Sequence, residues 1–317
     1  MQQATVRALV EERWPATHVA TTEALAAAGI TDRTLTAAVR AKCVHRVRRG
    51  AYVLGKVWNQ AKPWERAMLQ LDAHAASRTI PAVYSHVSAA RLLGCSVWDA
   101  GERIHISVPY ASSATSHGAD VAAHRVPVSD EDLVTVVRSG RLLRLTALER
   151  TVADCARVLD VERAAVIGDH ALRMGATVKG IAAAAERSGL VRGARRVERL
   201  LEALDGRSES AGETRTRLAL KAGGVPELQF EVMTEAGNFR ADFAWPSPKV
   251  ILEFDGDAKY VDYAPTAAVL MAERMRENAL TAAGWVIVRT RWAELATPEV
   301  IVAKVMTAFA RAARLAG

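Results

Sequence analysis

The chain has 317 residues, half of them apolar and about a quarter charged, with a formal net charge of +7. This length excludes a single ordinary domain, so two or three domains with hydrophobic cores are expected. The positive charge favours a polyanionic partner and carries no information about the fold.

Cysteine usage and hydropathy predict a cytoplasmic protein. Cys43, Cys95 and Cys155 are far apart and form no CxxC pair or metal-ligand spacing, so a reducing compartment is expected. The first residues hold no apolar signal segment, and no run of about 18 apolar residues occurs, so no membrane span is predicted.

Residues 1–57 are predicted to form a winged helix-turn-helix domain. Two short helical patterns are joined by a tight turn at Gly29, and V-H-R-V-R-R-G-A-Y-V-L-G then predicts two strands with a basic turn, the wing. The range contains nine basic and four acidic residues. The predicted N-caps are Thr21 or Thr22 for the first helix of the pair and Thr31 or Asp32 for the second.

The positive charge of this range is concentrated on the second helix of the pair and on the wing, where DNA would bind. That helix is expected in the major groove, and the wing on phosphates or in the minor groove. The alternative is a small helical cap whose basic residues are merely solvated. The predicted DNA contacts are Arg33, Thr34, Thr36 and Arg40 on the helix, with Arg46, Arg48 and Arg49 on the wing.

Residues 58–204 are predicted to form a mixed α/β middle domain. Thr146, followed three residues later by Glu149, predicts a capping box at a helix start. Charged residues here could be catalytic, although such residues more often fasten a helix to a sheet: Arg144, Glu149, Arg150 and Asp154. The histidines lack metal-ligand spacing and are each interpreted as structural or exposed: His86, His105, His117 and His124.

Residues 205–317 begin with a polar, Gly- and Ser-rich linker and are predicted to follow the order α-β-β-β-α-β-α. The stretch 240–260 contains a β-hairpin. Side chains alternate along a strand, so Glu253 and Asp255 are expected to share one face of this hairpin.

Acidic residues crowd this hairpin, with Asp242 on one strand and Glu253 and Asp255 on its partner. Like charges at close range are costly unless a cation or a substrate compensates them. A bare glutamate within the apolar strand V-I-L-E-F is costly for the same reason. An Asp and a Glu on neighbouring strands, followed by Lys259, form the arrangement of a magnesium-dependent nuclease site. The alternatives are a surface hairpin tip and a decayed nuclease fold that only binds DNA.

A series of short motifs runs along this last range in the order S-E-S-A-G-E-T-R-T-R-L, R-A-D-F-A-W, V-I-L-E-F-D-G, K-Y, R-M-R-E-N-A-L and A-G-W-V-I-V-R-T. In this order they resemble the core of the PD-(D/E)XK nuclease superfamily, and in particular its very-short-patch-repair-endonuclease-like branch. The resemblance implies a restriction-endonuclease-like fold and Mg²⁺-dependent (or Mn²⁺-dependent) hydrolysis of phosphodiester bonds in DNA.

The resemblance also assigns roles to residues. It makes Asp242 the central metal ligand, Glu253 the second ligand and Glu213 an outer acid. The pattern has a lysine two residues after the second acid, where this chain has Asp255. Lys259 could replace that lysine, or Asp255 could add a metal ligand. Two residues of the following helix could face the site or form an ordinary solvated pair: Arg276 and Glu277.

The stretch R-R-G-A-Y and the later stretch T-A-L-E-R-T-V-A-D-C-A-R are similar to the abortive-infection-type (type IV) antitoxin family. This resemblance implies a DNA-binding repressor, whose partners would be DNA, a cognate toxin and a second copy of the chain.

The whole chain is therefore predicted to be α/β, an α+β multidomain protein with domains at 1–57, 58–204 and 205–317. Two functions remain open. The first is a DNA-binding protein with a Mg²⁺-dependent endonuclease domain. The alternative is an antitoxin-like transcriptional regulator whose nuclease-like domain is inactive.

Overall fold

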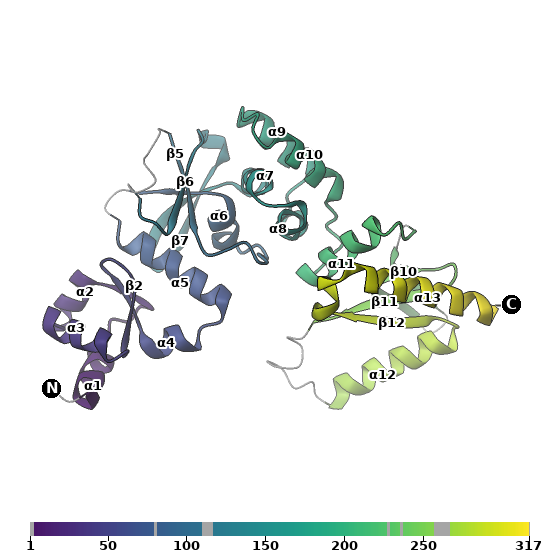
Figure 1. Cartoon of the computed structure of the whole chain (residues 1–317), viewed down its shortest axis with the longest axis horizontal. Helices are drawn as coiled ribbons and strands as arrows, with labels where there is room; N and C mark the ends of the chain where they lie inside the picture. The colour runs from purple at the N-terminus through teal and green to yellow at the C-terminus, as the bar shows by residue number, and fades with distance from the viewer. Residues whose placement is uncertain are drawn as a thin grey trace. The chain divides into compact units, whose positions relative to one another are not determined.

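The computed structural model describes residues 3–78, 81–109, 117–226, 229–234, 237–256 and 267–316. These residues form a mixed α/β protein with three separate sheets (Figure 1). The chain divides into two compact units, Met1–Leu159 with Lys179–Val197 and Asp160–Val178 with Glu198–Gly317. The predicted division into three domains, with boundaries after residues 57 and 204, stays a prediction. None of the helices in the described part combines the length and apolar character that crossing a membrane requires.

The first sheet lies at the start of the chain and has the antiparallel strand order β1-β3-β2. The predicted caps are confirmed, because the hydroxyls of Thr21 and Thr31 accept hydrogen bonds from the backbone of Ala24 and Thr34. Gly29 ends the second helix with φ of +78°, which suits glycine. The elements are α1 (Gln3–Arg13), β1 (Val19–Thr21), α2 (Thr22–Ala27), α3 (Asp32–Arg40), β2 (Val44–Arg48) and β3 (Ala51–Leu54).

The second sheet belongs to the same unit and has the order β6-β5-β4-β8-β7, with parallel pairs β5–β6 and β4–β8. Its core joins Leu71 of α5 to Tyr84, Ile106 and Leu145 of the strands. The elements are α4 (Gly55–Gln60), α5 (Pro63–Ala76), β4 (Val83–Tyr84), α6 (His86–Leu92), β5 (Ile104–Val108), β6 (Val121–Arg125), β7 (Leu133–Arg138), β8 (Arg141–Thr146), α7 (Leu148–Val158) and α9 (Val178–Arg187).

The predicted capping box at the start of α7 is wrong. Thr146 is the last residue of β8, and its hydroxyl lies 2.7 Å from that of Thr151. Ala147 is the N-cap, and it makes no side-chain cap hydrogen bond. The S/T-x-x-E pattern failed because strand pairing kept Thr146 in β8.

The third sheet belongs to the second unit and has the order β12-β11-β10-β9, with β11 and β12 parallel. The predicted order α-β-β-β-α-β-α is observed from α11 to α13. The elements are α8 (Val161–Arg173), α10 (Ala194–Ala203), α11 (Ala211–Ala222), β9 (Gln229–Thr234), β10 (Gly237–Trp245), β11 (Val250–Asp255), α12 (Ala267–Ala282), β12 (Val286–Arg291) and α13 (Pro298–Ala316).

Helices cover both faces of this third sheet, as Figure 1 shows for α12 and α13. Leu252 and Phe254 of β11 pack with α11 and α13, whereas Ile251 packs with α12. Strand alternation therefore places Glu253 and Asp255 on the α12 face, as predicted. The burial of β11 on both faces explains why it is almost continuously apolar.

A buried aspartate fastens α8 to the helix that opens the C-terminal fold. Oδ2 of Asp169 accepts hydrogen bonds from Oγ1 of Thr214 at 2.8 Å and from Nη2 of Arg217 at 2.7 Å. Burial raises the pKa of Asp169, and Arg217 opposes that shift. This network explains why α8 joins the second unit.

Gly212 is expected to tolerate no side chain, because a Cβ there would lie 2.0 Å from Cε1 of the buried Phe254 ring. Gly212→Ala should destabilise the fold by about 1–3 kcal/mol and speed hydrogen exchange in α11 and β11 of the full chain, measured by mass spectrometry. The matched control is Gly256→Ala, whose Cβ would meet no atom of the described residues within 4 Å. Equal exchange in the two variants would contradict this packing.

Candidate functional site

Exposed basic side chains project from helix α3. Arg33, Thr36 and Arg40 are exposed on this helix and line one surface hollow. Thr34 is half-buried, and its Oγ1 lies 3.0 Å from that of Thr31, so it takes part in the helix start. The structure thus brings the two predicted arginines of α3 together on one accessible surface.

Strand β2 and the turn that follows it present two further arginines. Arg46 and Arg49 are exposed, and Gly50 closes the turn with φ of +80°. Arg48 differs, because its Nη1 lies 3.3 Å from Oδ2 of Asp120 and its side chain is only 17% exposed. Of the three predicted wing contacts, Arg48 is therefore already engaged within the protein.

The two predicted metal ligands lie on neighbouring antiparallel strands. β10 and β11 are antiparallel and pair Phe243 with Leu252. Asp242, one residue before Phe243, and Glu253, one residue after Leu252, are therefore next to this pair on the same side. Oδ2 of Asp242 accepts a hydrogen bond from the backbone N–H of Phe254 at 2.7 Å. This bond fixes the Asp242 carboxylate next to β11.

Arg276 of α12 faces Glu253. Its Nη2 lies 2.5 Å from Oε1 of Glu253 and 3.0 Å from the carbonyl oxygen of Arg240. The Glu253 side chain is 16% exposed. Burial raises the pKa of Glu253, Arg276 opposes this shift, and the charge of Asp242 adds to it. Of the two α12 residues that could either face the site or form a solvated pair, Arg276 therefore faces the site.

The other predicted site residues have different partners. Oε2 of Glu213 accepts from the backbone N–H of Glu209 at 2.7 Å, so this acid caps the start of α11. Asp255 is half-buried and pairs in register with Arg291 of β12. Glu277 accepts from Arg289 at 3.1 Å and so does not pair with Arg276. The prediction for Lys259 lies outside the described residues.

Asp242 and Glu253 fit the donor set that Mg²⁺ prefers, which is one or two carboxylates completed by water. Within the described ranges, the acids of this hairpin do not form a group of three whose oxygens all lie within 4.8 Å of one another. The bond from Arg276 to Oε1 of Glu253 competes with a metal for that oxygen. A metal at this pair would therefore bind Oε2 of Glu253 or displace Arg276 from Oε1.

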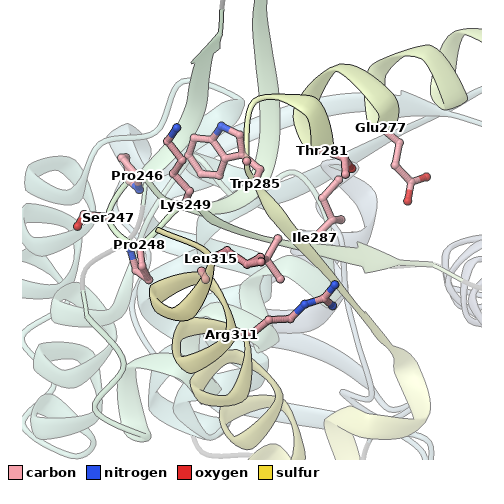
Figure 2. A pocket seen from close by; sticks show the side chains of 13 residues that line it. Pro246, Ser247, Pro248, Lys249, Glu277, Thr281, Trp285, Ile287, Arg311 and Leu315 are labelled. Atoms are coloured by element: carbon pink, nitrogen blue, oxygen red, sulfur yellow. The ribbon is translucent and has the colours of Figure 1, made fainter. Parts of the chain in front are cut away.

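A pocket opens at the other end of the hairpin, around the turn that joins β10 to β11 (Figure 2). Figure 2 shows Lys249 and Trp285 beside this turn, with Glu277 on α12 and Arg311 on α13. Three residue pairs, about 10 Å of strand, separate the turn from the Asp242 and Glu253 positions. Glu277 lines the pocket, whereas the predicted acids Glu213, Asp242, Glu253 and Asp255 do not.

Arg150, which the sequence left open as catalytic or structural, is buried among acids in the middle region. It donates to Asp154 at 3.0 Å and to Asp132 at 3.0 Å, and it also reaches the carbonyl oxygen of Pro127. Arg187 of α9 donates to the other oxygen of Asp132 at 2.6 Å. Burial raises the pKa of Asp154 to about 6, against the effect of Arg150. The network joins α7, α9 and the segment before β7, which is a structural role.

Three histidines that sequence spacing left apart lie together in the same unit. His86 starts α6, His105 lies on β5 and His124 on β6, and one ring nitrogen from each lies within 4.8 Å of the others. Burial lowers the pKa of His105 to about 3 and of His124 to about 4, and it lowers the pKa of His86 well below its ordinary value. The three rings are therefore neutral at physiological pH. The parallel pairing of β5 with β6 brings His105 and His124 together, and this pairing was not predicted from the sequence.

Comparisons with known proteins give no function. No model of a known protein family matches the chain. Two uncharacterized proteins of Mycobacterium tuberculosis, MT2308 of strain CDC 1551 / Oshkosh and Rv2248 of strain ATCC 25618 / H37Rv, are each 34% identical to it over 155 residues. That match covers 47% of this chain and 55% of each relative, so the chain spans about half the length of the curated relatives it matches.

Arg150→Met should destabilise the first unit by about 3–5 kcal/mol, because Asp154 would be left buried without its partner. Thermal unfolding of the full chain, followed by circular dichroism, measures this loss. The matched control is Arg144→Met, at an exposed position of β8, and it should change stability by less than about 0.5 kcal/mol. Similar losses in both variants would show that the Arg150 network is not structural.

Proposed function

We propose that the chain is a DNA-binding protein whose first sheet and helices form a winged helix and whose C-terminal fold is an endonuclease-like domain. The observation that carries the proposal is the set of exposed arginines on α3 and on the β2–β3 hairpin. The net charge of +7 supports a polyanionic partner.

DNA binding follows from how this surface is built. Thr31 and its cap bond fix the start of α3, which presents Arg33, Thr36 and Arg40 to solvent. Arginine suits both phosphate contacts and bidentate contacts to guanine. Arg46 on β2 and Arg49 on the following turn are exposed, so they can reach phosphates without leaving a buried charge unpaired.

Phosphodiester hydrolysis is proposed at Asp242 and Glu253. A Mg²⁺ ion bound there would lower the pKa of a water molecule and offset charge on the phosphate. Asp242 is oriented by the N–H of Phe254, and Glu253 is held in place by its strand and by Arg276. Arg276 places a positive charge next to Asp242 and Glu253. Once released from Glu253, it can stabilise negative charge on the phosphate.

The second candidate is a DNA-binding regulator whose C-terminal fold is inactive. The ion pair between Arg276 and Glu253 and the presence of Asp255 in place of the lysine support it. In this candidate the acids stabilise the fold, and a cognate toxin and a second copy of the chain are the proposed partners.

The double variant Arg46→Gln/Arg49→Gln should weaken binding to a DNA duplex and lower the slope of log affinity against log salt by about two, because each lost phosphate contact removes about one released ion. Fluorescence anisotropy over a range of salt concentrations measures both effects. The control double variant Arg141→Gln/Arg144→Gln removes the same charge from β8 and should keep most of the slope. A slope that falls equally in both would point to non-specific attraction.

Asp242→Asn and Glu253→Gln should each abolish Mg²⁺-dependent cleavage of plasmid and single-stranded DNA, whereas Glu277→Gln, which removes an acid paired with Arg289, should leave cleavage intact. Gel assays with Mg²⁺ and Mn²⁺ decide this. If wild type cleaves no faster than the Asp242→Asn/Glu253→Gln double variant, the hydrolase is rejected and the regulator remains.

A further inference from the structure

We infer that His86, His105 and His124 form a binding site for one zinc-like divalent transition metal, held by three imidazole nitrogens. The site is separate from the acidic pair on the hairpin, since it belongs to the other compact unit. Among the His, Cys, Asp and Glu side chains of the described residues, these three have donor atoms that all lie within 4.8 Å of one another.

The ring arrangement is close to what a metal requires. Tetrahedral Zn²⁺ binds histidine nitrogen at about 2.0–2.1 Å, so its nitrogen ligands lie about 3.4 Å from one another. Here Nδ1 of His105 lies 2.9 Å from Nε2 of His124, and all three donor atoms lie within 4.8 Å. The rings of His86 and His124 stack with centroids 3.7 Å apart. Because an imidazole binds a metal in the plane of its ring, His86 or His124 must tilt out of this stack for all three nitrogens to meet at one ion.

The backbone holds the histidines in place. His86 is buried with φ of +51°, a left-handed conformation that is uncommon for residues other than glycine and that clusters at functional sites. The N–H of Ser85 donates to the carbonyl oxygen of His105 at 3.1 Å, and the N–H of His105 donates to Oγ of Ser88 at 2.8 Å. These two bonds tie the start of α6 to β5 on either side of His86, so the surrounding structure maintains the strained residue.

The donor chemistry selects the metal. Three imidazoles suit Zn²⁺, Cu²⁺ or Ni²⁺, whereas Mg²⁺ prefers oxygen ligands. Three protein ligands leave a fourth position open in a tetrahedral site. Ser107 lies two residues from His105 on the same face of β5, and its buried Oγ has no hydrogen-bond partner among the described residues. It can receive a hydrogen bond from a metal-bound water.

The test uses the full chain without a polyhistidine tag, first treated with a chelator. Zn²⁺ titrated by calorimetry should bind one per chain, and Co²⁺ should give the visible absorption of a tetrahedral site. His105→Gln and His124→Gln should each weaken binding by more than about tenfold, because second-shell changes alone can cost that much. His45→Gln, at a half-buried histidine stacked on Trp58, should bind as wild type does.

Wild type alone keeps the inference falsifiable if the variants do not fold. Wild-type protein that binds no Zn²⁺ and gives no tetrahedral Co²⁺ spectrum would overturn it, and the three histidines would then form only a hydrogen-bonded stack. Binding that is lost equally in His45→Gln and His105→Gln would overturn it too. Loss of cleavage or of DNA binding tests the proposed function and does not bear on this site.

Discussion

Buried charges in this chain are compensated by opposite charges, and the arrangement of its helices depends on that constraint. Arg150 lies between Asp132 and Asp154, and Arg217 binds Asp169. Both networks join helices that are distant in sequence, because an unpaired buried ion would cost several kcal/mol. The need for an opposite charge also applies to Glu253, a carboxylate on the apolar strand β11 that lies on the sheet face covered by α12. There the compensating partner separates the two proposed functions: the ion pair with Arg276 supports the inactive regulator, and a bound metal would support the hydrolase.

The C-terminal fold was largely predictable from sequence because its signals are local. Alternation along β11 placed Glu253 and Asp255 on one face, and the order of helices and strands followed from periodicity and turn residues. The caps at Thr21 and Thr31 were predictable for the same reason. Thr146 shows the limit of such signals. Its cap pattern was sound locally, but strand pairing in β8 decided its conformation.

The side-chain partners could not be predicted, because they depend on which faces meet in three dimensions. Arg276 contacts Glu253 from a different element, and the hydrophobic periodicity of a helix or strand does not indicate which elements pack together. The histidines illustrate the point further: His105 and His124 are 19 residues apart, beyond the reach of a spacing motif, and parallel pairing of two strands brings their rings together. Residue types and faces were predictable, whereas pairings required the sheet order.

Under the proposed DNA-binding function, the ion pair between Arg48 and Asp120 would affect how the protein discriminates among nucleic acids. Asp120 is an intramolecular competitor for a guanidinium that a phosphate could also bind. Since the acid is 47% exposed, the pair is worth less than about 1 kcal/mol and can be exchanged. In that proposal a loosely fitting duplex would meet the β2–β3 hairpin with Arg48 still paired to Asp120, while a well-docked duplex would recruit this third arginine. Such competition within the protein would lower non-specific attraction without lowering the charge of the chain.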